Sequence, residues 1–288
     1  MNVSKYIHSI PFGREEAGII SLNRRGFLIG SLSCFALASC GSAKSKPEGL
    51  VPGEKAVVSR VRDGDTIILD TGLVVRLVGI EAPRRAWKDR KADAFGEEAA
   101  ELLMLVALGR KCQLFYGGLT RDRYDRALAY VRVEDEAGKD IWLNTRMVEL
   151  GGARVRTWAD NAVGVRELYT LETAARNQGM GLWQHAEYEV VSPDDFKNSP
   201  RGLVLLQGKL SKISEVIEPE SRCFINNNSG IDLILGLPLA RSNERCDLQV
   251  GQEIRVRAGL KREKTSTDKY DGTPFLQLDH WGQIETII

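Results

Sequence analysis

This sequence contains few histidines and has almost no net charge, and both features limit the kinds of catalysis and binding that it can support. Only three of the 288 residues are histidine, at His8, His185 and His280. No HExxH zinc motif is present, and a histidine-rich metal centre or a histidine-based nucleophile triad is disfavoured. The 40 lysines and arginines nearly balance the 39 acidic residues, so any attraction to nucleic acid must come from a local cluster. Catalysis would therefore have to use carboxylates, arginines and a hard metal ion.

The first forty residues carry the pattern of a bacterial export signal. Residues 23–28 read NRRGFL, a twin-arginine pattern, and an apolar run follows from Phe27 to Ala38. That run is shorter than the roughly 20 apolar residues that a membrane span requires. It ends in LASC at residues 37–40, which resembles a bacterial lipobox. A buried helix or a membrane-retained anchor is the alternative.

From these two signals we predict a twin-arginine lipoprotein signal over residues 1–40 and a flexible tether over residues 41–53. Cys40 would carry the lipid. The protein would then be exported and held on a membrane through its lipid anchor, facing the periplasm or the cell surface.

The five cysteines fit an exported protein. Cys34 would leave with the signal. In an oxidising compartment Cys223 and Cys246, both in the last third of the chain, are candidates for a disulfide; two independent core residues are the alternative. Cys112 lies in an alternating run and is predicted to be a buried strand residue.

Residues 54–184 show a strand-rich pattern with helices between and after the strands. Runs rich in β-branched residues, and later alternating runs, predict strands at 56–61, 66–69, 73–80, 113–116 and 127–133. Apolar spacing and end signals predict helices at 95–108, 143–150 and 163–176. This order predicts a mainly β (α+β) fold, an OB-fold five-stranded barrel with three helices packed outside it.

Five ordered blocks in the same stretch resemble the staphylococcal nuclease (thermonuclease) family. They are VRDGDT (61–66), RLVGIEAP (76–83), FGEEA (95–99), DRYDRALAY (122–130) and GMGLW (179–183). The resemblance covers residues 54–184, nearly half of the chain. It implies an OB barrel with calcium-dependent phosphodiesterase activity, which cleaves DNA and RNA through attack of a metal-proximal water on phosphorus.

The resemblance also implies roles for five residues. Asp65 matches the first calcium carboxylate, Glu81 the second, usually an aspartate, and Ala82 the residue whose carbonyl faces the ion; calcium accepts such hard oxygen ligands in irregular geometry. Arg76 and Arg126 match the two arginines that clamp the phosphate, a role that suits permanently charged, planar guanidinium groups.

Each residue, taken singly, also has a simpler interpretation. Asp65 follows a turn between two strands, and Arg76 fits an exposed strand position. Arg126 is spaced to form a surface ion pair with Asp122 or Asp125. The cluster as a whole favours the family interpretation over these.

One position departs from the family pattern. Arg84 stands where the family carries the glutamate thought to act as general base, and a guanidinium can neither accept a proton nor favour a nearby cation. Asp89 or Asp93 would be a substitute carboxylate, and solvated loop charges are the alternative. Because a general base contributes about 10²–10⁴-fold, its loss would weaken catalysis without necessarily abolishing it.

Three residues are candidate substrate contacts. Tyr124 matches a position that lines the nucleotide pocket in the family. Arg84 and Trp87 belong to a cationic loop over residues 84–91, which suits a single strand of nucleic acid because its charges attract phosphates and its tryptophan can stack on a base.

The rest of the chain reads as a linker over residues 185–200 and a small all-β domain over 201–288, with only a weak resemblance to OB-type domains. A ligand-binding role and a structural role are equally open for this domain. The sequence thus predicts an exported, calcium-dependent nuclease of DNA or RNA, weakened at position 84. The alternative is a catalytically inactive module that binds nucleic acid or a protein partner.

Overall fold

The computed structural model describes residues 49–135, 137–195, 202–213, 220–225, 233–238, 248–259, 275–278 and 280–287. The predicted export signal, Cys40 and Cys246 lie outside these ranges, so the lipid anchor and the disulfide remain predictions. Within the described ranges, no helix has the length and hydrophobicity needed to cross a membrane.

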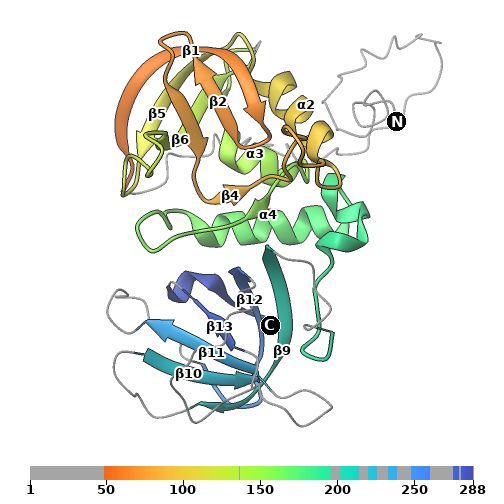
Figure 1. The fold of residues 1–288 in the computed structure, drawn as a ribbon. Helices are drawn as coiled ribbons and strands as arrows, with labels where there is room; N and C mark the ends of the chain where they lie inside the picture. The colour runs from red at the N-terminus through yellow and green to blue at the C-terminus, as the bar shows by residue number, and fades with distance from the viewer. Residues whose placement is uncertain are drawn as a thin grey trace, which may run out of the picture. The chain divides into compact units, whose positions relative to one another are not determined.

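Five strands near the start of the described chain form a closed barrel (Figure 1). They are β1 (Val51–Asp63), β2 (Thr66–Leu69), β3 (Val74–Leu77), β5 (Lys111–Tyr116) and β6 (Ala127–Glu134). Antiparallel pairings join β3 to β2, β2 to β1, β1 to β5 and β5 to β6, and a parallel pairing of β3 with β6 closes the ring. The short strand β7 (Asp140–Trp142) extends the sheet beyond β6. The predicted five-stranded OB-type barrel is confirmed.

Three helices accompany the barrel, as predicted: α2 (Gly96–Ala107), α3 (Leu143–Glu149) and α4 (Val165–Asn177). Helix α2 buries Ala99, Leu102, Leu103 and Ala107, four of the five apolar positions whose spacing predicts it; the fifth, Val106, is half-buried. Short 3₁₀ helices follow α4 at Gly181–Gln184 and Ala186–Tyr188. The helices thus complete the hydrophobic core that the barrel strands begin.

The predicted strand over residues 73–80 is interrupted in the structure. Strand β3 ends at Leu77, and the chain turns through Gly79, whose φ of +77° favours glycine, before β4 (Ile80–Glu81) pairs with β8 (Arg154–Val155). The turn is held from inside, because the buried Asn144 side chain donates to the carbonyl of Val78 at 2.8 Å. The interruption moves Glu81 off the barrel sheet and places it opposite β8.

A second six-stranded sheet occupies the C-terminal part of the described chain. Its strands are β9 (Leu203–Ile213), β10 (Glu220–Ile225), β11 (Leu233–Pro238), β12 (Glu253–Gly259), β13 (Phe275–Gln277) and β14 (Ile284–Thr286). Strand β9 pairs with β10 and β12, β10 pairs with β11, and β11 pairs in parallel with β13. If β9, β10, β11, β12 and β13 are matched in order to β1, β2, β3, β5 and β6, these pairings correspond to four of the five that build the first barrel. This pattern agrees with the weak OB-type resemblance seen in the sequence.

A buried ionic cluster, the Glu172 cluster, joins helix α4 to this sheet. It consists of Glu172, Arg257 and Glu285. Glu172 and Arg257 form an ion pair, and Arg257 Nη1 lies 3.0 Å from Glu285 Oε2. Glu172 is 0% exposed and Arg257 1%. Tyr169, one turn before Glu172, donates its hydroxyl to the carbonyl of Gly282. Residues 46–288 accordingly form one compact unit.

Candidate active site

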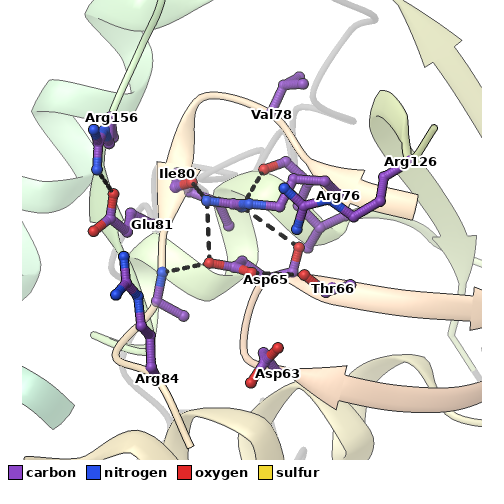
Figure 2. Close-up of polar contacts among 12 residues, drawn as sticks. Asp63, Asp65, Thr66, Arg76, Val78, Ile80, Glu81, Arg84, Arg126 and Arg156 are labelled. Atoms are coloured by element: carbon purple, nitrogen blue, oxygen red, sulfur yellow. Dashed lines mark hydrogen bonds and ion pairs between the residues drawn. The ribbon is translucent and has the colours of Figure 1, made fainter. Parts of the chain in front are cut away.

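Asp65 is anchored at the start of β2, directly after the turn from β1. It is buried, and Oδ1 accepts a hydrogen bond from the Thr66 hydroxyl at 2.8 Å. Oδ2 accepts from the backbone N–H of Ala82 at 2.9 Å and lies 3.1 Å from Nη2 of Arg76 (Figure 2). The structure therefore brings together three residues that the sequence resemblance had placed at one site.

Arg76 connects this carboxylate to the turn that follows β3. Its Nη1 donates to the carbonyls of Leu77 at 2.7 Å and Asp65 at 3.5 Å, and its Nη2 donates to the carbonyl of Ile80 at 2.8 Å. An arginine exposed on a strand would not make these contacts, so the simpler interpretation of Arg76 is wrong. Arg76 is half-buried and holds the turn that carries Glu81.

Glu81 is paired with an arginine that the sequence reasoning missed. Its Oε2 accepts from Nη1 of Arg156, just after β8 (Figure 2). Burial by itself raises the pKa of Glu81, but attraction to Arg156, with smaller contributions from Arg154 and Arg76, leaves that pKa below its usual value. Glu81 is therefore an ionised carboxylate with a built-in guanidinium partner. The sequence offered only a weak signal for Arg156, an arginine two positions after Arg154 in a short alternating stretch.

Arg126 forms the ion pair that the simpler interpretation expected. Its Nε and Nη2 lie 2.7 and 2.6 Å from Oδ2 of Asp122. Oδ1 of Asp122 accepts from the backbone N–H groups of Tyr124 at 2.9 Å and Arg126 at 3.0 Å. Desolvation raises the pKa of Asp122, and these hydrogen bonds and the charge of Arg126 outweigh it, so the pKa is lowered. Asp122 thus orders the loop and the arginine together.

The strand register also brings Arg126 to the same side of the barrel as Arg76. Arg76 is opposite Leu128 in the parallel pairing of β3 with β6, and Arg126 lies two residues before Leu128. Arg126 itself directly precedes β6, which begins at Ala127, so it lies at the end of the strand that pairs with β3. Figure 2 shows the Arg126 side chain extending toward Arg76. Tyr124 is 66% exposed, with the guanidinium carbons of Arg123 and Arg126 at 4.9 and 5.7 Å from its ring centre.

The cationic loop after β4 is pinned at its base. The backbone N–H of Arg84 donates to Oδ2 of Asp93 at 2.9 Å, and the backbone N–H of Asp93 donates to the Arg84 carbonyl at 2.9 Å. Trp87 and Arg90 exchange two backbone hydrogen bonds of 3.0 Å around a tight turn. Trp87 is 67% exposed, and the Arg84 side chain is exposed as well. Asp93 uses its carboxylate to hold the loop, which makes it a poor substitute base.

The donor chemistry of the site suits a hard cation such as calcium. The two carboxylates, Asp65 and Glu81, are linked through the Asp65 to Ala82 hydrogen bond, and they are oxygen ligands of the kind calcium prefers. The family resemblance assigns the Ala82 carbonyl as a third oxygen. Among the described residues, no group of three or more His, Cys, Asp or Glu side chains is arranged to hold a metal.

Fold and site together define a class, an OB-type barrel with two buried or half-buried carboxylates and two arginines on the same side of the barrel. Residues 74–185 match the family model described as "Staphylococcal nuclease homologue", and this match supports a staphylococcal nuclease-like domain in this part of the chain.

Individual relatives agree with this assignment. The thermonuclease of Staphylococcus intermedius is 28% identical over 137 residues, which cover 46% of this chain and 79% of the relative. The thermonuclease of Staphylococcus hyicus is 28% identical over 131 residues, 44% of this chain and 75% of the relative. The probable endonuclease LCL3 of Pyricularia oryzae is 33% identical over 141 residues, 48% of this chain and 52% of the relative.

Proposed function

We propose that the barrel domain hydrolyses phosphodiester bonds in DNA or RNA with the help of calcium. The observation that carries this proposal is the cluster of Asp65 and Glu81 with Arg76 and Arg126 beside it. The names of the thermonuclease and endonuclease relatives support the same reaction class.

We assign each residue of the site a role in metal binding, phosphate binding or nucleotide contact from the chemistry of its side chain or carbonyl. Asp65, Glu81 and the Ala82 carbonyl are the oxygens that would hold calcium, which on binding supplies positive charge next to the scissile phosphate. Arg76 and Arg126 would hold the phosphate and stabilise the negative charge that grows on it in the transition state. Tyr124, exposed beside Arg126, would contact the nucleotide.

Arg84 is the reason to expect slow turnover. It occupies the position where the family resemblance places a general base, and its exposed guanidinium has no capacity to accept a proton. The loss of base catalysis alone corresponds to about 10²–10⁴-fold in rate. We therefore propose an activity well below that expected of a family member with a base at this position.

The export pattern adds a location to the proposal. We infer that the chain is secreted through its twin-arginine signal, lipidated at Cys40 and held on a membrane facing the periplasm or the cell surface. Nucleic acid outside the cytoplasm would then be the substrate.

A second candidate function rests on the loop of residues 84–91. An exposed tryptophan at a tight turn, surrounded by arginines and lysines, is suited to binding a single strand without cleaving it. A catalytically inactive module that binds nucleic acid, or a protein partner, is therefore the alternative.

Digestion of single-stranded DNA by the full chain, with calcium and then with a chelator, tests the first candidate. We expect slow, calcium-dependent cleavage that Arg126→Ala abolishes. Arg132→Ala is the matched control, because Arg132 lies in β6, the strand that directly follows Arg126, and also forms an ion pair, with Asp140 at 3.0 Å. If calcium-dependent cleavage is absent while the DNA is retained in a gel-shift assay, the binding module replaces the enzyme.

A further inference from the structure

Glu81 already has a cationic partner in this chain. We propose that Arg156 competes with a divalent cation for Glu81 and thereby sets the metal affinity of the site. This inference rests on the proposed calcium site and deepens it, since it names the residue that controls its occupancy.

The position of Arg156 is fixed by the backbone around it. Its N–H donates to the carbonyl of Gly79 at 3.0 Å, and β8, directly before it, pairs with β4 so that Arg154 lies opposite Glu81. The pairing of β4 with β8 therefore fixes the position of Arg156 next to Glu81, so their contact does not depend on two long, mobile surface side chains.

Buried contacts on both sides hold the segment 154–157. The Val155 N–H donates to Oε1 of Glu172 at 2.7 Å, and the Thr157 hydroxyl lies 3.0 Å from Nε2 of the buried His280. The guanidinium of Arg154 donates to the carbonyl of Leu203 at 2.9 Å. These three contacts, to β9, to helix α4 and to His280, therefore leave the segment little freedom to move Arg156 away.

The side chain of Arg156 is also ordered at its outer end. Its guanidinium carbon lies 4.7 Å from the ring centre of Trp158, a stacking distance that favours a cation over an aromatic face. The ion pair itself is mostly shielded, with side-chain exposures of 26% for Arg156 and 15% for Glu81. A shielded, preorganised pair is harder to displace than a solvated one.

The charge balance of the site also indicates that Arg156 competes with a cation for Glu81. Asp65 is paired with Arg76 and Glu81 with Arg156, so each carboxylate of the site is neutralised by its own guanidinium. A divalent cation gains most from carboxylates whose charge is not already compensated. Binding the metal at Glu81 requires Arg156 to release or share the carboxylate, and this lowers the affinity.

Calcium titration of the full chain by isothermal calorimetry tests the proposal. Arg156→Gln removes the charge and keeps a polar side chain, and we expect its calcium dissociation constant to fall at least about tenfold, since a unit charge at contact distance influences binding by this much even when partly screened. Arg156→Lys retains the charge, so its calcium dissociation constant should lie closer to that of the parent than to that of Arg156→Gln. Arg132→Gln, which removes an arginine from a different ion pair, should leave calcium binding unchanged.

The outcomes separate this inference from the nuclease proposal. Tighter calcium binding by Arg156→Gln supports the inference whether or not DNA is cleaved. Unchanged affinity in a variant that unfolds at the parent's temperature overturns it, even if the parent is an active nuclease. No calcium binding by Arg156→Gln up to about 10 mM, beyond the range of weak protein sites, overturns it as well.

Discussion

Glu172 offers a sharp test of how the barrel and the C-terminal sheet are joined. Its side chain has no exposed surface. Oε2 pairs with the guanidinium of Arg257 and lies 4.0 Å from Nη1 of Arg176, and Oε1 accepts from the N–H of Val155. Glu172→Gln keeps the size and the acceptor for Val155 but removes the charge. Arg257, which is 1% exposed, would then retain Glu285 as its carboxylate partner in the cluster.

The expected loss follows from the burial of the pair. Removing one member of a buried ion pair costs about 3–5 kcal/mol. Because Glu285 remains 3.0 Å from Arg257, we place the loss for Glu172→Gln at the lower end, about 3 kcal/mol. With a urea slope of about 3 kcal/mol per molar, the midpoint of unfolding falls by about 1 M. Glu172→Ala also leaves the Val155 N–H without its acceptor, which adds about 1–3 kcal/mol.

Urea unfolding followed by circular dichroism measures these differences. The double variant Glu172→Met with Arg257→Met removes both charges of the pair, and it should be more stable than Glu172→Gln because the deeply buried guanidinium of Arg257 is no longer left without Glu172. A loss below about 1 kcal/mol for Glu172→Gln would refute the reasoning, since it would mean that the charge of Arg257 is compensated by solvent or by Glu285 alone.

Three further outcomes follow from the site and from the export pattern. Arg84→Glu should raise calcium-dependent cleavage at least about tenfold by restoring a base, and adding Arg126→Ala should cancel the gain; a folded variant with no gain in rate or calcium binding would contradict the assignment. Cys40→Ser should move the protein from the membrane to the soluble fraction, and unchanged fractionation would exclude the lipid anchor. The lowered pKa of Glu81 means that its ion pair stabilises the fold above about pH 4.5 and loses that effect as the pH falls through the lower folded-state value. The stability difference between parent and Glu81→Gln should therefore shrink between about pH 7 and pH 3 in urea titrations, and a constant difference would argue against it.

Much of the barrel was predictable because its signals are local. The β-branched residues of β1 and β2 and the apolar spacing of α2 are signals from residues close in sequence, and the structure places these elements within about five residues of the predicted bounds. The strands that were missed, β7, β8 and β14, contain only two or three residues each, too few to show a periodicity. Their existence depends on the partner strand.

Most residues of the site could be predicted from the sequence, but the contacts that hold them could not. Asp65, Arg76 and Ala82 were expected to lie together from the resemblance, and they do. The partner of Glu81 was not found, because Arg156 is 75 residues away and their contact depends on the pairing of two two-residue strands. The Glu172 cluster has the same origin, since Arg257 lies 85 residues from Glu172 and reaches it only when the C-terminal sheet has formed.

The bonding of Arg76 makes phosphate binding and the shape of the turn after β3 interdependent. A guanidinium has five N–H groups, and the two terminal nitrogens of Arg76 are directed to the carbonyls of Leu77, Ile80 and Asp65 and to the Asp65 carboxylate. With those contacts made, Nε–H is the donor left for a ligand. A phosphate that takes a second donor must displace one of the contacts that tighten the turn, so ligand affinity and backbone rigidity oppose each other at this arginine. Substitutions that stiffen residues 77–80 would then weaken phosphate binding without touching the phosphate.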